Sequence, residues 1–300
     1  MTTAVAEPGQ RPRRSVRRSL AAGLDQHPRV RLVLLLALPI GALGIIYFGS
    51  LVVLFLNAFW SRDAFTGQVV REFTLANFQK LGSPLFITVV LRTLGMAAAV
   101  TITCAVVAFP IAYYMARIAS PARRGLLVVA VLMPLWASYL IKAYSWRLIL
   151  AEDGVLNWVL EPFGLKGPGY SEVGLWLVFT YLWLPYMILP VYAGLERIPN
   201  SLLEASSDLG GRGWRTFRHV ILPLAFPAVV AGSIFTFSLT MGDYIAPNLV
   251  TRGEQFIGNL ILTNFGVPDL PLAAAQALVP LAIMVIYLLV ARRLGAFEAL

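Results

Sequence analysis

The chain has 300 residues, of which 58% are hydrophobic and only 13% are charged, and its formal net charge is +9 at pH 7. Soluble domains carry about 25% charged residues, so a water-soluble globule of this composition would lack the charged side chains that its surface needs. The apolar residues fall instead in runs of about 20, the length that crosses a hydrocarbon core of ~30 Å. These runs do not alternate as the strands of a membrane barrel do, so the sequence predicts an all-α polytopic membrane protein.

Residues 1–30 form a basic segment ahead of the first apolar run. Its cationic side chains, together with the first residue of that run, are Arg11, Arg13, Arg14, Arg17, Arg18, Arg29 and Arg31. Such a cluster is typical of a cytoplasmic anchor at an anionic membrane face. The segment is too long and too basic for a removed signal peptide, and it lacks a small-residue cleavage site. We expect a disordered cytoplasmic tail here.

Residues 31–295 are expected to form one domain of six membrane spans. The spans are predicted at 31–59, 86–116, 124–150, 173–195, 220–242 and 272–292. Lysine and arginine gather in the tail, in the connection after the second span, in the interval 196–219 and after the last span. The other connections hold few of them. Because cytoplasmic loops carry the excess of positive charge, both termini and the loop 196–219 are predicted to be cytoplasmic.

The loop 196–219 has the pattern of a short, self-terminated helix. Ser201 precedes Glu204 by three residues, which is the spacing of a capping box. Gly210 suits a left-handed stop at the other end, so the helix should be about nine residues long. One face then presents Leu202, Ala205, Ser206 and Leu209, while Glu204 and Asp208 lie on another.

Two interpretations of this helix compete. An amphipathic loop helix can simply lie on the lipid headgroups. Alternatively, a partner docks on it, and the small side chains of Ala205 and Ser206 allow that partner's backbone to approach closely. The capping box, the glycine stop and the Leu222-Pro223 pair that follows at a fixed distance favour docking.

The chain carries no recognisable catalytic or nucleotide-binding set. It has no Gly-x-x-x-x-Gly-Lys-Ser/Thr loop, and none of its lysines (Lys80, Lys142 and Lys166) follows a glycine. Two distant histidines and the single Cys104 cannot complete a zinc site. We therefore expect a non-catalytic chain with no cofactor or metal of its own, and an energy source on another polypeptide.

The segment around the short helix resembles a known family signature. Glu204-Ala205-Ser206, then Gly210, then Leu222-Pro223 is similar to the pattern of permease subunits in binding-protein-dependent type I ABC importers. Ser206 stands where that pattern has a second alanine, and Val220 stands where it has isoleucine. Further segments resemble the spermidine/putrescine branch, in particular the first of its two permease subunits. They are 73–78, 109–117, 134–146, 242–250 and 257–260.

The resemblance implies a machine of several subunits. It would comprise a second, non-identical permease, two ATP-binding subunits that hold ATP and Mg, and an extracellular solute-binding protein, all at a bacterial inner membrane and without nucleic acid. It also implies that the short helix transmits closure of the ATPase pair to the spans. The residues assigned to this coupling are Ser201, Glu204, Ala205, Ser206, Asp208, Gly210, Leu222 and Pro223.

A cationic solute would need carboxylates and aromatic faces along its pathway. The candidates at the end of the fifth span and along the third span are Asp243, Tyr244, Trp136, Tyr139, Tyr144 and Trp146. The plainer interpretation is a solvated loop acid and ordinary interfacial aromatics. Lys142 and Arg147 are expected to pair with Glu152, Asp153 or Asp243, or to reach the interface.

Two alternatives remain for the function. The same machine could serve another solute, because permeases for ferric iron, thiamine and sulfate share much of this pattern. An ion-coupled secondary transporter is the other possibility. It is less favoured because Glu172 and Asp243 lie near the edges of spans, whereas a proton or ion relay needs carboxylates deep inside them.

Overall fold

The computed structural model describes residues 28–63, 65–267 and 269–296. Most of the basic tail predicted at 1–30 therefore lies outside the described residues. The chain divides into two compact units, Met1–Leu56 and Asn57–Leu300, which are considered separately here.

The first unit contains α2, a helix of 31 residues at Pro28–Ala58. Its segment Leu35–Ala58 is long and apolar enough to cross a membrane, which agrees with the span predicted at 31–59. Large apolar side chains such as Leu43, Ile45 and Phe48 are exposed in this chain, as expected for a surface that faces lipid or another protein.

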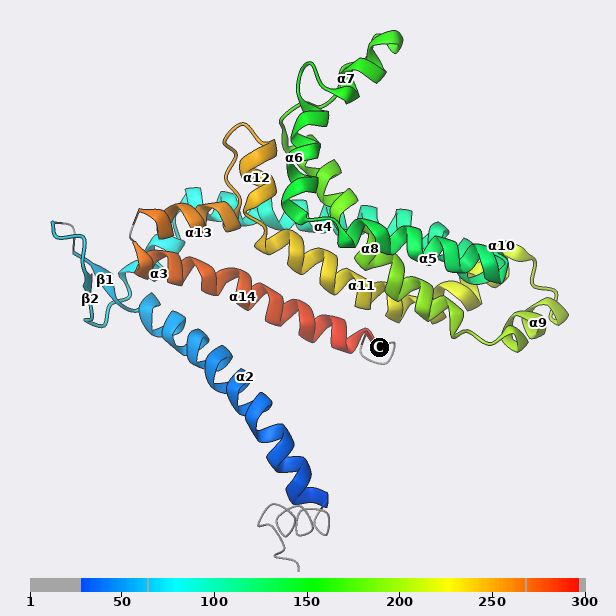
Figure 1. Cartoon of the computed structure of the whole chain (residues 1–300), viewed down its shortest axis with the longest axis horizontal. Coiled ribbons are helices and arrows are strands. Elements are labelled where there is room, and N and C mark those ends of the chain that lie inside the picture. Colours follow the sequence, from blue (N-terminus) through cyan, green and yellow to red (C-terminus); the bar gives the residue numbers. More distant parts are fainter. Residues whose placement is uncertain (1–27, 64, 268, 297–300) are drawn as a thin grey trace, which may run out of the picture. The chain divides into compact units, whose positions relative to one another are not determined.

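The core of the second unit is built by three helices that pack against one another (Figure 1). These are α4 (Pro84–Tyr113), which continues into the π-helical turn η1 (Tyr114–Ile118), α8 (Glu172–Glu196) and α11 (Leu222–Gly242). A fourth long helix, α14 (Leu270–Arg293), packs against α11. Each is long and apolar enough to span a membrane, so the predictions for spans two, four, five and six are confirmed.

Two glycines allow α8 and α11 to cross closely. A Cβ atom on Gly194 of α8 would collide with the Cβ of Ala228, and one on Gly232 of α11 would collide with the Met187 side chain. Small residues at such crossings let helix backbones approach within van der Waals contact, which is the main attraction between helices in lipid. The contact therefore depends on the absence of side chains at these two positions.

The predicted third span, 124–150, is not a single helix. The structure has α5 (Pro121–Trp136) and α6 (Tyr139–Leu150), which meet at 90°. Ala137 and Ser138 between them are extended. Pro134 in the last turn of α5 cannot donate a backbone hydrogen bond, which favours a break here. Lys142 Nζ donates to the carbonyl oxygen of Pro134 at 3.1 Å and so contacts the last turn of α5.

The connections gather at the two ends of this bundle (Figure 1). The end where α4 and α14 begin is called the α12 end. It carries the antiparallel pair β1 (Ser61–Arg62) and β2 (Val69–Val70), in which Ser61 pairs with Val70, and the helices α3 (Ala76–Leu81), α12 (Ile245–Val250) and α13 (Ile257–Gly266). Helix α6 contacts α12 and leads into α7 (Val155–Leu160) and η2 (Glu161–Phe163), and α6 and α7 project away from the bundle beside α12 (Figure 1).

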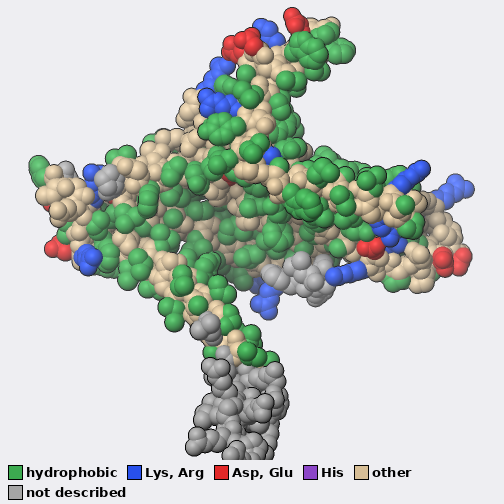
Figure 2. All heavy atoms as spheres, in the orientation of Figure 1, with side chains coloured by type: hydrophobic (Ala, Val, Ile, Leu, Met, Phe, Trp, Pro, Cys, Tyr) green, Lys and Arg blue, Asp and Glu red, His purple; other side chains and the backbone are tan. Residues whose placement is uncertain are grey.

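The opposite end, called the α9 end, carries α9 (Asn200–Asp208), α10 (Gly213–Thr216) and the π-helical turn η3 (Phe217–Ile221). Hydrophobic side chains cover the flank of the bundle between the two ends, whereas Lys, Arg, Asp and Glu gather mainly at the ends and on the α6–α7 segment (Figure 2). This distribution is that of a membrane-embedded bundle with two polar ends.

The Gly194 crossing can be tested by adding one methyl group. We expect Gly194→Ala to lower the stability of the purified protein by about 1–3 kcal/mol, because the new Cβ overpacks the contact with Ala228. Gly125→Ala in α5 is the matched control, since a Cβ there meets no atom within 4 Å. The measurement is thermal unfolding in detergent. Equal midpoints for the two variants would show that the crossing tolerates a side chain.

Candidate functional site

The short helix predicted in the loop 196–219 is present as α9, with nine residues, Asn200–Asp208. It ends as the sequence indicates. Gly210 has φ +77°, a left-handed conformation that residues with a Cβ avoid. The N–H of Gly210 donates to Ser207 O at 2.9 Å and that of Gly211 to Ser206 O at 2.8 Å, which satisfies two carbonyls of the last turn.

The capping box predicted at the start of α9 is not formed. The position before the helix is Pro199, and no side chain caps the first turn. Proline has the fixed φ that suits this entry, and its ψ of 139° is extended. The helix therefore begins one residue before Ser201, which places Ser201 inside the first turn rather than ahead of it. Ser201 and Glu204 are both exposed, so their side chains are available to a partner instead.

A compact set of contacts joins α9 to α10. Ser206 Oγ and Thr216 Oγ1 are hydrogen-bonded at 2.9 Å. Gly211 fits between the two helices, because a Cβ on it would lie 2.6 Å from both Ser206 O and Ser206 Oγ. Ser206, the residue that departs from the alanine of the family signature, thus holds the two helices together. The hydroxyl offers a hydrogen bond that alanine cannot make.

The segment after α10 is anchored on α4 by aromatic side chains. Phe217 meets the rings of Phe109 and Tyr113 edge to face, with centroids 5.5 and 6.5 Å apart, and stacks on Trp214 at 5.4 Å. Leu222 and Pro223, the pair singled out in the sequence, begin α11 directly after η3. The helical path continues from α10 through η3 into α11, over Gly213–Gly242.

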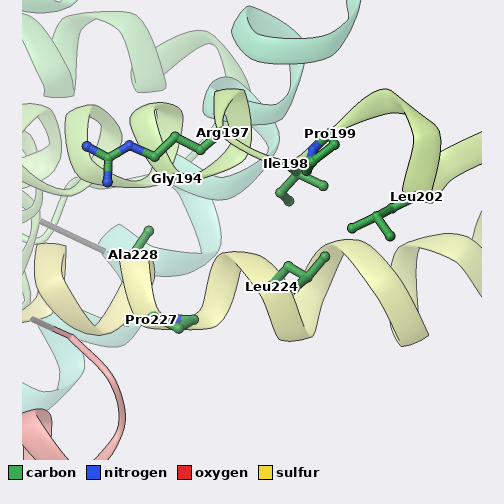
Figure 3. A pocket seen from close by; sticks show the side chains of 8 residues that line it. All are labelled: Gly194, Arg197, Ile198, Pro199, Leu202, Leu224, Pro227 and Ala228. Carbon is green, nitrogen blue, oxygen red and sulfur yellow. The ribbon is translucent and has the colours of Figure 1, made fainter. Parts of the chain in front are cut away.

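Two hollows flank α9. One, of about 290 Å³, lies between the end of α8, the start of α11 and Leu202, which faces Leu224 across it (Figure 3). Its other lining residues are Gly194, Arg197, Ile198, Pro199, Pro227 and Ala228. The second, of about 380 Å³, is lined by Leu202, Ala205, Ser206 and Leu209 together with Gly211, Arg215, His219 and Val220.

The four residues predicted to share one face all line the second hollow: Leu202, Ala205 and Ser206 of α9, and Leu209 directly after it. Leu209 is 88% exposed, although it is a large apolar side chain at a polar end of the bundle. Glu204 and Asp208 are exposed as well. The α9 end therefore presents an open, partly apolar surface rimmed by charges, a composition that suits a protein partner.

At the α12 end, Asp243 joins two interrupted helices. It follows the last residue of α11, and its Oδ1 accepts from the N–H groups of Ile245 and Ala246, each at 2.9 Å, at the start of α12. Its Oδ2 accepts from the hydroxyl of Tyr139, the first residue of α6, at 2.5 Å. Burial raises the pKa of the Asp243 carboxyl, and these hydrogen bonds oppose the rise by favouring the charged form.

The other proposed pathway residues do not converge on Asp243. Trp136 is 86% exposed, Tyr144 and Tyr244 are also exposed, and Trp146 packs on Tyr181 with centroids 5.5 Å apart. The expected ion pairs differ too. Arg147 lies over the ring of Tyr170 at 5.8 Å and Lys142 contacts a backbone carbonyl, while Glu152 meets Arg252 at 3.7 Å.

Sequence reasoning missed a row of aromatic rings that begins at Tyr139. Trp183 of α8 lies parallel to Tyr139 with centroids 6.0 Å apart, and Tyr186 follows at 6.0 Å from Trp183. Phe235 of α11 stacks on Tyr186 at 6.4 Å. The spacing of 183 and 186, one helical turn apart within a predicted span, is the signal that could have placed them on one face.

The comparisons with known proteins agree with this arrangement. Residues 108–297 match the family described as "Binding-protein-dependent transport system inner membrane component". The chain belongs to this family. It is a membrane-embedded permease subunit of an ABC importer.

Two relatives and one solved structure illustrate the range of this similarity. The inner membrane ABC transporter permease protein YdcU of Escherichia coli strain K12 is 49% identical over 91% of this chain and 93% of its own length. The spermidine/putrescine permease PotB of Haemophilus influenzae is 34% identical over 64% of this chain and 68% of its own length. A bacterial alginate ABC transporter chain shares the fold, with a TM-score of 0.71 at 16% identity over 92% of this chain and 98% of its own.

The glycine stop of α9 gives a direct test of the local structure. Gly210→Val should loosen the end of the helix, because a β-branched residue in the left-handed region costs about 1–2 kcal/mol. Hydrogen exchange at the backbone amides of 205–209 should then accelerate. Gly213→Val, at the start of α10 where a Cβ meets nothing within 4 Å, is the control. Unchanged exchange in the Gly210 variant would show that α9 does not need this stop.

Proposed function

We propose that α9 is the helix on which an ATP-binding subunit docks, and that the importer served by this permease carries a polyamine such as spermidine or putrescine. The observation that supports docking most strongly is the α9 surface itself. It combines an exposed Leu209, a hollow whose lining includes the small residues Ala205, Ser206 and Gly211, and a hydrogen bond to α10 between Ser206 and Thr216.

In this proposal the subunits have the following arrangement. Two permeases, this chain and a non-identical partner, form the pathway. Two ATP-binding subunits hold ATP and Mg on the cytoplasmic side, and an extracellular solute-binding protein delivers the solute. The α9 end, with both termini, then faces the cytoplasm, in accord with the arginines at 197, 212, 215 and 218. This chain itself is non-catalytic.

The polyamine assignment draws on relatives and on chemistry. Several relatives at 32–34% identity are named as spermidine/putrescine permeases, whereas the name of the 49% identical relative states no solute. Aromatic faces and a carboxylate attract ammonium groups and methylene segments, and Tyr139, Trp183 and Asp243 bring both features to one place. The alternative is another solute carried by the same machine, such as ferric iron, thiamine or sulfate. Membership of this family argues against an ion-coupled secondary transporter.

Docking is tested by reversing a charge on α9. Glu204→Arg places a cation on an exposed position of the helix and should abolish uptake while the subunit remains in the membrane, because like charges or a lost pair at a docked surface cost several kcal/mol. The measurements are solute uptake and co-purification of the ATP-binding subunit. Arg123→Glu is the control, because Arg123 is exposed and lies outside α9, in the first turn of α5. Normal uptake and co-purification with Glu204→Arg would exclude docking through this surface.

The solute is tested at Asp243. Asp243→Asn keeps an oxygen that can accept from the N–H groups of Ile245 and Ala246, so the start of α12 should hold. If an ammonium group pairs with this half-buried carboxylate, the spermidine concentration for half-maximal uptake should rise by tenfold or more, roughly the effect of one desolvated ion pair. Asp153→Asn alters an exposed acid near the same end. It should change the spermidine concentration for half-maximal uptake by much less. Equal kinetics for both variants would make Asp243 a purely structural cap.

A further inference from the structure

One arginine joins the end of α4 to the junction between α8 and α9. Arg117 lies in the π-helical turn η1. Its Nη2 donates to the carbonyl oxygens of Leu195 and Ile198, the latter at 2.6 Å, and its Nη1 donates to Asn200 Oδ1 at 2.9 Å. Leu195 is in the last turn of α8, Ile198 is in the connection, and Asn200 is the first residue of α9. A single guanidinium thus contacts three successive points of the chain.

The Arg117 guanidinium and the backbone carbonyls of Leu195 and Ile198 are chemically complementary. Carbonyls in the last turn of a helix lack donors within the helix, and a positive charge is favourable there. The guanidinium offers several N–H donors in a planar, fixed geometry, whereas the lysine ammonium is a compact point charge on a flexible stem. Leu195 and Ile198 are buried, so water does not readily replace the donors that Arg117 supplies.

A second arginine reinforces the same connection from α5. Arg124 donates from Nε to Met115 O at 3.1 Å and from Nη2 to Ala116 O at 3.0 Å, and its Nη1 lies 2.9 Å from Glu196 Oε1. The Arg124 and Glu196 side chains are 33% and 46% exposed, and partly exposed pairs of this kind contribute little. Arg117 supplies the direct hydrogen bond from η1 to the first residue of α9.

The far end of α9 returns to the same helix. Ser206 bonds to Thr216 of α10, and the next residue, Phe217, packs its ring against Phe109 and Tyr113 of α4. Both contact points on the α9 side of the bundle, η1 and η3, are π-helical turns. Such turns are rare and often mark functional sites. α9 is therefore held to α4 at its beginning, through Arg117, and beyond its end, through Phe217.

We infer that Arg117 is the positioning residue that makes α4 follow α9, so that a displacement of α9 by the ATP-binding subunit moves α4 and α8 together as one body. The inference rests on the docking role proposed above. Without the guanidinium, the junction 195–200 would keep the packing of Leu195 and Ile198 in the core but would lose its hydrogen bonds to η1. The start of α9 could then shift while the end of α4 stays behind. ATP would then be hydrolysed without solute crossing.

The first test measures solute molecules imported per ATP hydrolysed. The assembled complex is reconstituted in vesicles with its solute-binding protein, with spermidine as the probe. Arg117→Gln should lower this ratio by about tenfold, because the free energy of one charged hydrogen bond corresponds to about a tenfold change in an equilibrium constant. Arg117→Lys should restore it in part. Arg123→Gln, at an exposed position in the first turn of α5, should match the wild type.

The outcomes separate the inference from the function on which it rests. If the wild-type complex shows no hydrolysis stimulated by the loaded binding protein, the proposed function fails. If the wild type is stimulated but Arg117→Gln keeps the wild-type ratio of solute to ATP, the inference is overturned. A loss of assembled complex with an unchanged ratio also overturns it, since that is the signature of a merely structural role.

The second test follows the motion itself. Spin labels on Ser207→Cys in α9 and Val106→Cys in α4 report the separation of the two helices, and both positions are exposed, whereas the native Cys104 is fully buried and should not react. In the wild-type background the distance should be the same with and without ATP and vanadate. With Arg117→Gln it should change or broaden when ATP is bound. Identical distances in both backgrounds would contradict a transmitting role for Arg117.

Discussion

The close crossing of α8 and α11 is the constraint on which the rest of the second unit depends. Gly194 and Gly232 leave no room for side chains at two levels of this contact, and α4 packs on both helices. These helices run the length of the bundle and carry α9 and α10 at one end and the Asp243 junction at the other. A movement imposed at either end is therefore applied to a single packed body, because closely packed helices shift as units rather than deform.

The two ends differ in the kind of contact that they use. At the α9 end, hydrogen bonds to backbone carbonyls and aromatic packing tie a short helix to the bundle, while its outer face stays open. At the α12 end, a carboxylate joins the starts of two helix fragments, α6 and α12, through Tyr139 and two backbone N–H groups. Both fragments follow breaks in longer apolar segments. Broken helices in a membrane protein occur where the irregular backbone is buried in protein or lines a polar cavity.

Hydrophobic run length was sufficient to predict most of the fold. The spans at 86–116, 173–195, 220–242 and 272–292 correspond within a few residues to α4, α8, α11 and α14, because the apolar character of 20 residues is a local property. The prediction of the third span as one straight helix was wrong, because hydropathy does not report a change in the direction of the helix axis. Pro134 was visible in the sequence, but proline is tolerated inside other spans here, such as Pro110 and Pro227, so it could not be distinguished as a break.

The candidate site was predicted unevenly for a similar reason. Gly210 was recognised because a left-handed stop has a local signature. The predicted capping box is wrong because the helix is capped two residues earlier, at Pro199 rather than Ser201. Both residues suit a helix start, and only the backbone conformation decides between them. The hydrogen bonds of Arg117 join residues 78 or more positions apart. Trp183 stacks on Tyr139, which belongs to a different helix. A single sequence does not reveal contacts of either kind. In the sequence, Arg117 was therefore only the last residue of the family-like segment 109–117 and one of the charges that set orientation.

The central claim, that α9 is the surface that meets the ATP-binding subunit, is tested most directly by a cross-link from Leu209. A benzophenone maleimide attached to Leu209→Cys, at a position 88% exposed, is photolysed in membranes that contain the assembled importer, and Leu165→Cys at the α12 end serves as the matched position. The account predicts an adduct with the ATP-binding subunit from Leu209 alone. An adduct only with lipid at Leu209, or an equal yield of the ATP-binding subunit from Leu165, would contradict it.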